Sequence, residues 1–135
     1  EKALLCLSPN YIAGKMMIVR AFVLGLDLVL VDPSGNPLKN TDFAKIDFAA
    51  MVPLQALNSV QNEKERQQFR KIKKTIIGGG VVSKSLLNLL QKENNNFYAT
   101  YGMTETITHI AVKKLSSGSL QLPAKKEAQR LFEKN

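Results

Sequence analysis

The sequence contains no tryptophan, one cysteine, one histidine and few acidic residues, with 11 Asp and Glu against 19 Lys and Arg in 135 residues. The one cysteine, Cys6, cannot form an internal disulfide, and its apolar neighbours predict a buried, unreactive thiol that fits a reducing, cytoplasmic compartment. Any His-dependent triad or metal site would need His109, for which an ordinary structural role is expected. No apolar run approaches the roughly 18 residues that a membrane-spanning helix needs, so a membrane-spanning helix is not expected.

The net charge of +8 raises the question of a polyanionic partner. The densest basic stretch runs from Lys64 to Lys74, and a helix over it would place Arg66, Arg70 and Lys73 on one side. Such a stripe is usually a solvated face. The stretch has little aromatic interleaving for base stacking, and the chain has no recognisable nucleic-acid motif. A nucleic-acid partner is therefore not expected, and a polyanion-binding module stays as an alternative.

Short apolar runs alternate with segments of helical periodicity along the chain. The expected strands cover residues 4–7, 28–31, 48–52, 75–77, 97–99 and 107–112, and the expected helices cover 11–24, 54–60, 63–71 and 84–92. This alternation predicts an α/β fold, a three-layer sheet with helices on both faces, over residues 1–115. Residues 116–135 read as a linker followed by an amphipathic tail.

Two glycine-containing segments follow predicted strands, where ligands bind in open α/β sheets. Gly78–Gly80 follows the strand at 75–77, and consecutive glycines permit positive φ and close approach of a flat ligand. Tyr101–Glu105 follows the strand at 97–99. Its Thr104 hydroxyl can donate to a phosphate, and its Glu105 carboxylate can hold Mg²⁺. Taken alone, both segments are also compatible with plain surface turns.

The run Tyr101-Gly102-Met103-Thr104-Glu105 resembles the Tyr-Gly-x-Thr-Glu signature of the acyl-adenylate-forming, AMP-binding superfamily. The order of the segments also agrees with that family. Its glycine-rich loop precedes the signature by one helix and one strand, as Gly78–Gly80 does in this chain. Over Leu4–Leu38 and Thr75–Ala111 the chain most resembles the o-succinylbenzoate–CoA ligases of menaquinone synthesis. The resemblance implies part of the large N-terminal domain of such an enzyme.

For the nucleotide, the resemblance implies that Tyr101 stacks on adenine beside Gly102. It also implies that Thr104 contacts the adenylate phosphate and that Glu105 binds the Mg²⁺ ion. The implied small molecules are ATP or AMP, Mg²⁺, a carboxylate and CoA as co-substrate.

For the acyl substrate, the resemblance implies that Gly79 and Gly80 border the adenine and the acyl group. Tyr11 falls where many relatives carry a histidine or another aromatic residue beside the phosphates, which makes it a candidate substrate-binding residue.

Three parts of the family pattern are not recognised in these 135 residues: the Ser/Thr/Gly-rich phosphate loop, the ribose-binding Asp and the small domain with the catalytic Lys. The expectation is therefore the middle of a larger acid–CoA ligase, without turnover on its own. A non-catalytic nucleotide-binding module is the second hypothesis. Association of copies into a homo-oligomer would cover apolar surface that such a piece exposes.

Overall fold

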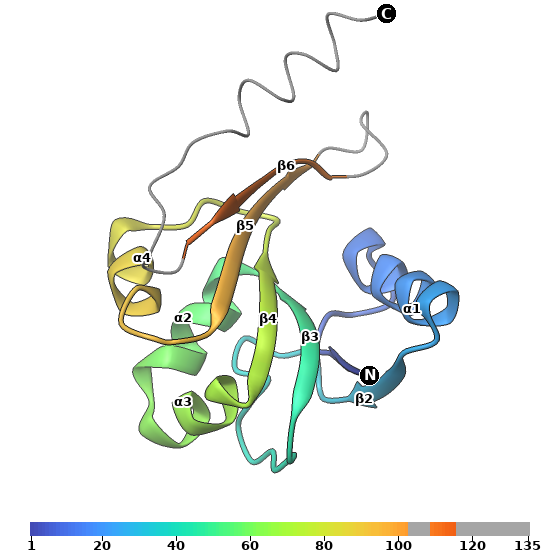
Figure 1. Ribbon diagram of the computed structural model, residues 1–135, viewed down its shortest axis with the longest axis horizontal. Helices are drawn as coiled ribbons and strands as arrows, with labels where there is room; N and C mark the ends of the chain where they lie inside the picture. The colour runs from blue at the N-terminus through green and yellow to red at the C-terminus, as the bar shows by residue number, and fades with distance from the viewer. Residues whose placement is uncertain (103–108, 116–135) are drawn as a thin grey trace, which may run out of the picture.

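Within residues 1–102 and 109–115, which the computed structural model describes, six strands form one sheet (Figure 1). The strands are β1 (Lys2–Leu5), β2 (Asp27–Leu30), β3 (Ile46–Met51), β4 (Ile72–Ile77), β5 (Asn96–Gly102) and β6 (His109–Lys114). Their order across the sheet is β2-β1-β3-β4-β5-β6. β1 to β5 run parallel and β6 pairs antiparallel with β5. The carboxyl ends of five strands therefore meet at one edge.

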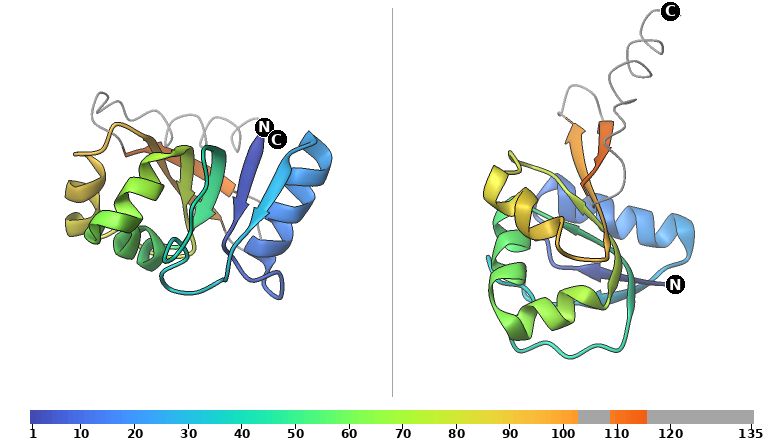
Figure 2. Two further views of the ribbon diagram at one scale, coloured as in Figure 1. Left: turned by 90° about the horizontal axis from the view of Figure 1, so that it is seen from below. Right: turned by 60° about the vertical axis from the view of Figure 1, so that its left-hand side comes forward.

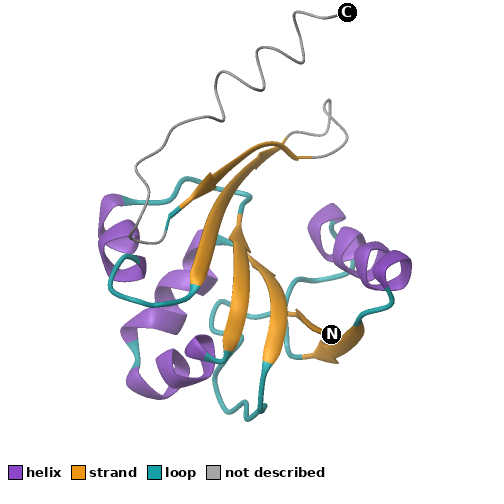
Figure 3. Cartoon of the chain, in the orientation of Figure 1, coloured by secondary structure: helices purple, strands orange, loops and turns teal. Residues whose placement is uncertain are grey.

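The helices lie on both faces of this sheet (Figure 2). α1 (Ile12–Leu24) covers one face, and α2 (Pro53–Gln61), α3 (Glu63–Arg70) and α4 (Lys84–Leu90) cover the other (Figure 3). As expected of an N-cap, the Ser83 hydroxyl accepts a hydrogen bond from the Leu86 amide, 3.2 Å away, at the start of α4. Gly25 ends α1 in the left-handed conformation, with φ 63°. The predicted three-layer α/β architecture is confirmed.

The core consists of two apolar clusters, one for each face of the sheet. The larger cluster lies under α2, α3 and α4, and in it the rings of Phe69 and Phe97 stack with centroids 5.2 Å apart. The smaller cluster lies under α1 and joins Met17 to Leu5 and Ala50. The sheet is thus packed most extensively on the side of the three later helices.

Cys6 lies in the larger cluster and is fully buried. Its thiol donates to the carbonyl oxygen of Ala50, 3.2 Å away, and burial raises the pKa of Cys6 to about 12. The thiol is therefore protonated at neutral pH, and reactivity needs the thiolate. The prediction of a buried thiol is confirmed.

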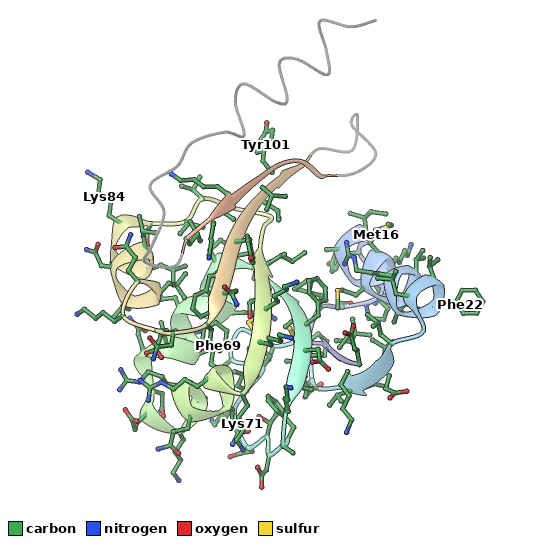
Figure 4. All side chains as sticks on the ribbon, viewed as in Figure 1. Met16, Phe22, Phe69, Lys71, Lys84 and Tyr101 are labelled. Carbon is green, nitrogen blue, oxygen red and sulfur yellow. The ribbon has the colours of Figure 1, made fainter. Side chains whose placement is uncertain are left out.

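The helix over Tyr11–Leu24 forms as expected, but its buried face differs from the predicted apolar stripe. The buried residues of α1 are Gly14, Met17 and Ala21, two of which are small and let the helix approach the sheet closely. Ile12, Met16, Val19 and Val23, whose spacing of three and four residues in the sequence predicts an apolar stripe, lie on the exposed side instead. Phe22, 88% exposed, points away from the molecule (Figure 4). A helix that is apolar all round gives no single face to a periodicity argument.

The basic stretch is divided between a helix and a strand, so no single helix carries Arg66, Arg70 and Lys73 on one side. α3 ends at Arg70 and Lys73 belongs to β4. Arg70 donates to both carboxylate oxygens of the buried Glu93, at 2.6 and 3.2 Å, and Arg66 pairs with Glu63. These two arginines are therefore already engaged by carboxylates of the chain.

Among the helices of the described residues, none combines the length and the apolar character needed to cross a bilayer.

Candidate functional site

The candidate site residues lie at the edge where the parallel strands end. β1 leads into the turn before Tyr11, β3 into Val52 and Pro53, and β4 into Gly78–Gly80. β5 ends with Tyr101 and Gly102. Both the glycine loop and the start of the signature lie at the carboxyl ends of strands, as expected, and they lie side by side because β4 and β5 are neighbours with Ile77 opposite Ala99.

Gln55 ties three parts of this edge to one another. Its amide nitrogen donates to the carbonyl oxygens of Cys6, at 2.8 Å, and Ser34, at 2.9 Å. Its amide oxygen accepts from the backbone N–H of Val52, at 3.2 Å. The side chain is 4% exposed, so one buried amide joins the segments that follow β1, β2 and β3.

The glycine loop continues the sheet for one residue and then turns. The Gly78 amide still donates to the carbonyl of Met51 on β3, at 3.1 Å. Gly79 then adopts φ +76°, a conformation that side-chain-bearing residues rarely take. A Cβ on Gly80 would touch the ring of Pro53 at 3.4 Å. The sequence-based expectation of positive φ in this loop is confirmed at Gly79.

Thr100 packs directly against this loop from β5. Its hydroxyl donates to the carbonyl oxygen of Ile77 at 3.4 Å. A Cβ built on Gly78 would lie only 2.5 Å from the same hydroxyl oxygen. The loop and the end of β5 are thus in van der Waals contact.

Tyr101 and Gly102 lie within β5, where a loop was expected to begin. Tyr101 pairs with Ala111 and Gly102 with His109, with a register irregularity between the two pairs. The antiparallel partner β6 extends β5 beyond the predicted end at Ala99. Tyr101 is 55% exposed and projects from the end of the sheet (Figure 4). Thr104 and Glu105 lie outside the described residues.

Tyr11 is at the same edge but farther along the sheet, because β3 separates β1 from β4. It is 74% exposed and forms the N-cap of α1. Its amide donates to the Ser8 carbonyl oxygen at 3.2 Å. A Cβ on Gly14 would lie 2.1 Å from that oxygen, so the turn lies against the helix backbone.

Sequence reasoning missed Gln55, Thr100 and the packing role of Gly14. Gly14 lies inside the predicted helix, and a glycine at such a position indicates close packing, so its role could have been predicted. Gln55 and Thr100 carried no such signal, because their partners depend on which strands are neighbours.

The described part of this edge fits a nucleotide in two respects. It offers an exposed aromatic ring, Tyr101, for a base, and next to it a glycine backbone at Gly79 and Gly80 that a flat ligand can approach. In residues 1–102 and 109–115, no three His, Cys, Asp or Glu side chains are grouped as metal ligands would be. The candidate metal ligand Glu105 is not among these residues.

Comparison with known proteins identifies the family. The model of a family described as AMP-binding enzyme matches residues 1–130. The chain belongs to this family. An acyl-CoA synthetase (AMP-forming)/AMP-acid ligase II-like protein from Dyadobacter fermentans is 38% identical, with a TM-score of 0.83 over 89% of this chain and 34% of that one. The AMP-binding family that the signature predicted is therefore confirmed.

Two o-succinylbenzoate coenzyme A synthetase structures share the fold at lower identity. The unliganded enzyme from Bacillus subtilis is 17% identical, with a TM-score of 0.63 over 85% of this chain and 25% of that one. The same enzyme in complex with ATP and magnesium ion is 17% identical, with a TM-score of 0.60 over 85% and 24%. Among proteins with curated functions, none is significantly similar in sequence. This AMP-binding family member thus spans about a third of the length of the Dyadobacter protein and a quarter of the others.

Proposed function

We propose that the chain forms the nucleotide- and acyl-binding core of an acid–CoA ligase. The observation that supports this most is the exposed Tyr101 at the end of β5, beside the glycine loop of β4, in a chain of the AMP-binding family. In this proposal Tyr101 stacks on adenine and Gly79, Gly80 and Gly102 border the ligand. Tyr11 reaches the substrate from the end of β1.

The proposed reaction has two group transfers. A carboxylate oxygen of the substrate bonds to the α-phosphorus of ATP, the bond to the bridging α–β oxygen breaks, and pyrophosphate leaves. The CoA thiol loses its proton to solvent, the resulting thiolate bonds to the acyl carbon, and AMP leaves with the electrons of the acyl–oxygen bond. Mg²⁺ would supply charge neutralisation at the phosphates. Thr104 would hold a phosphate oxygen and Glu105 would hold the ion.

We propose o-succinylbenzoate as the carboxylate and the cytoplasm as the location. The support is the resemblance over Leu4–Leu38 and Thr75–Ala111, together with the free thiol of Cys6. The division into residues 1–115 and a separate tail belongs to the same proposal. The exposed apolar side of α1 supports the association of copies.

A polyanion-binding module is the alternative that one specific surface favours. A groove of about 420 Å³ beside α1 is lined by Arg20, Lys73 and Lys74, by apolar side chains, and by Glu1 and Thr100. Asp47 also lines it, and the guanidinium of Arg20 lies over the Phe48 ring at 5.4 Å. Binding there would fall steeply with salt.

The proposed metal role predicts that ATP binding depends on Mg²⁺ through Glu105. In the 135-residue chain, Glu105→Gln should remove most of the increase in ATP affinity that Mg²⁺ produces, because the amide keeps the size but loses the charge. Isothermal titration with ATP, with and without Mg²⁺, measures this.

Glu63→Gln, on the exposed side of α3, is the matched control and should leave the Mg²⁺ effect intact. An unchanged Mg²⁺ effect in Glu105→Gln would refute the assignment of Glu105 as the metal ligand.

A further inference from the structure

The contact between Thr100 and Gly78 joins the two halves of the candidate nucleotide site. Ile77 and Ala99 are register partners, and one residue later Gly78 and Thr100 meet. The Thr100 hydroxyl occupies the place of a Gly78 side chain, since a Cβ there would be 2.5 Å from the hydroxyl oxygen. The other near atoms of Thr100, its carbonyl oxygen and its Cβ, would be at 3.6 and 3.8 Å, which is ordinary contact.

The same hydroxyl also forms a hydrogen bond to β4. It donates to the carbonyl of Ile77, the last residue of β4, at 3.4 Å. On the other side, the Gly78 amide donates to Met51 of β3. The peptide group that joins Ile77 to Gly78 is therefore held from both neighbouring strands just before the chain turns at Gly79.

Each member of the contact precedes a proposed ligand-binding residue. Gly78 is followed by Gly79 and Gly80, and Thr100 is followed by the exposed Tyr101. The distance between the glycine backbone and the tyrosine ring therefore depends on how closely Gly78 and Thr100 approach.

We propose that Thr100 and Gly78 are a positioning pair that sets the width of the slot for the nucleotide base. The inference rests on the proposed function, because it assumes that Tyr101 and the glycine loop hold the base. Neither residue touches the nucleotide in this account. Both act through the segments that they hold together.

The test first introduces a steric clash between position 78 and the Thr100 hydroxyl, and then removes that hydroxyl. Gly78→Ala should weaken binding of Mg·ATP and of AMP roughly five- to tenfold, since a binding geometry tolerates displacements of only about 0.5 Å. Adding Thr100→Ala should restore affinity to within about twofold to threefold, because it removes the hydroxyl that the new Cβ meets. Gly35→Ala is the matched control, since its Cβ would meet side-chain atoms at 3.6 and 3.8 Å only.

Amide NMR spectra of the same variants separate this inference from the proposed function. Gly78→Ala should shift the amide signals of Gly79, Gly80 and Tyr101, and the double variant should return them toward wild type, whether or not nucleotide binds. A wild-type chain that binds neither nucleotide would refute the proposed function, while restored signals would still support the contact. Unmoved signals and affinity in Gly78→Ala would overturn the positioning pair, since Thr100 would then have rotated its hydroxyl away without consequence.

Thr100→Val covers the case in which Gly78→Ala does not fold. It removes the hydroxyl and keeps the size, so it should shift the same three amide signals and weaken Mg·ATP binding about threefold. Signals and affinity equal to those of wild type in this variant would also overturn the proposal.

Discussion

Gly14→Ala should lower the free energy of unfolding by about 2–3 kcal/mol, although alanine is the better helix former. The new Cβ would lie 2.1 Å from the Ser8 carbonyl oxygen and 2.9 Å from that of Leu7. Both atoms belong to the backbone of the turn between β1 and α1, so no side-chain rotation relieves the contact. The turn that carries Tyr11 would have to move. Urea denaturation followed by far-UV circular dichroism measures the loss.

Gly35→Ala provides the comparison for Gly14→Ala, and it should leave the stability within about 0.5 kcal/mol of wild type. Gly35 lies in the loop after β2, and a Cβ added there would contact only side-chain atoms, at 3.6 and 3.8 Å. A Gly14→Ala chain at least as stable as wild type would contradict the close approach of the turn to α1.

Gln55→Leu should lower the free energy of unfolding by about 3 kcal/mol, because it removes three hydrogen bonds and leaves their backbone partners without a replacement. The lost bonds are those to Cys6, Ser34 and Val52. Leucine matches the size of glutamine, so the loss reports hydrogen bonding more than packing. The same urea denaturation experiment applies, and amide signals of residues after β1 and β3 should broaden.

Gln61→Leu tests whether this effect is specific to position 55. Gln61 ends the same helix, α2, and is exposed, so its substitution should change stability by less than about 0.5 kcal/mol. Equal losses in the two variants would contradict the role of Gln55 in joining the strand ends.

The elements that the sequence predicted well are those with strong local signals. Gly25 after α1 and Ser83 before α4 are such signals, because glycine adopts a left-handed cap most easily and a serine hydroxyl supplies the acceptor that the first turn of a helix needs. The break between α3 and β4 lacked such a signal. Ile72 already begins β4 and is buried, yet the lysines that follow it hide the strand pattern.

The buried face of α1 was harder to predict for a different reason. Apolar side chains of α1 point to all sides of the helix, so periodicity alone could not show that Met17 and Ala21 face the sheet while Phe22 faces outward. The choice depends on how closely the helix backbone can approach the sheet, and Gly14 and Ala21 permit it. That information lies in tertiary packing, not in local propensity.

The candidate site also combines features that local sequence signals predict with features that depend on tertiary packing. The rule for parallel sheets placed the glycine loop and Tyr101 at the carboxyl ends of strands, and the pairing of β4 with β5 makes them neighbours. The hydroxyl contact of Thr100 with Gly78 did not follow, because it depends on a register fixed only when β4 and β5 pair.

The central claim is that this edge of the sheet binds a nucleotide, and amide NMR during titration of the chain with Mg·ATP tests it most directly. The account predicts saturable shifts concentrated at Gly79, Gly80, Tyr101 and Gly102, largely retained at higher salt. No saturable shift at these residues would contradict it. So would shifts centred on Lys73 and Lys74 that disappear as salt rises, since these would assign ATP to the basic groove beside α1.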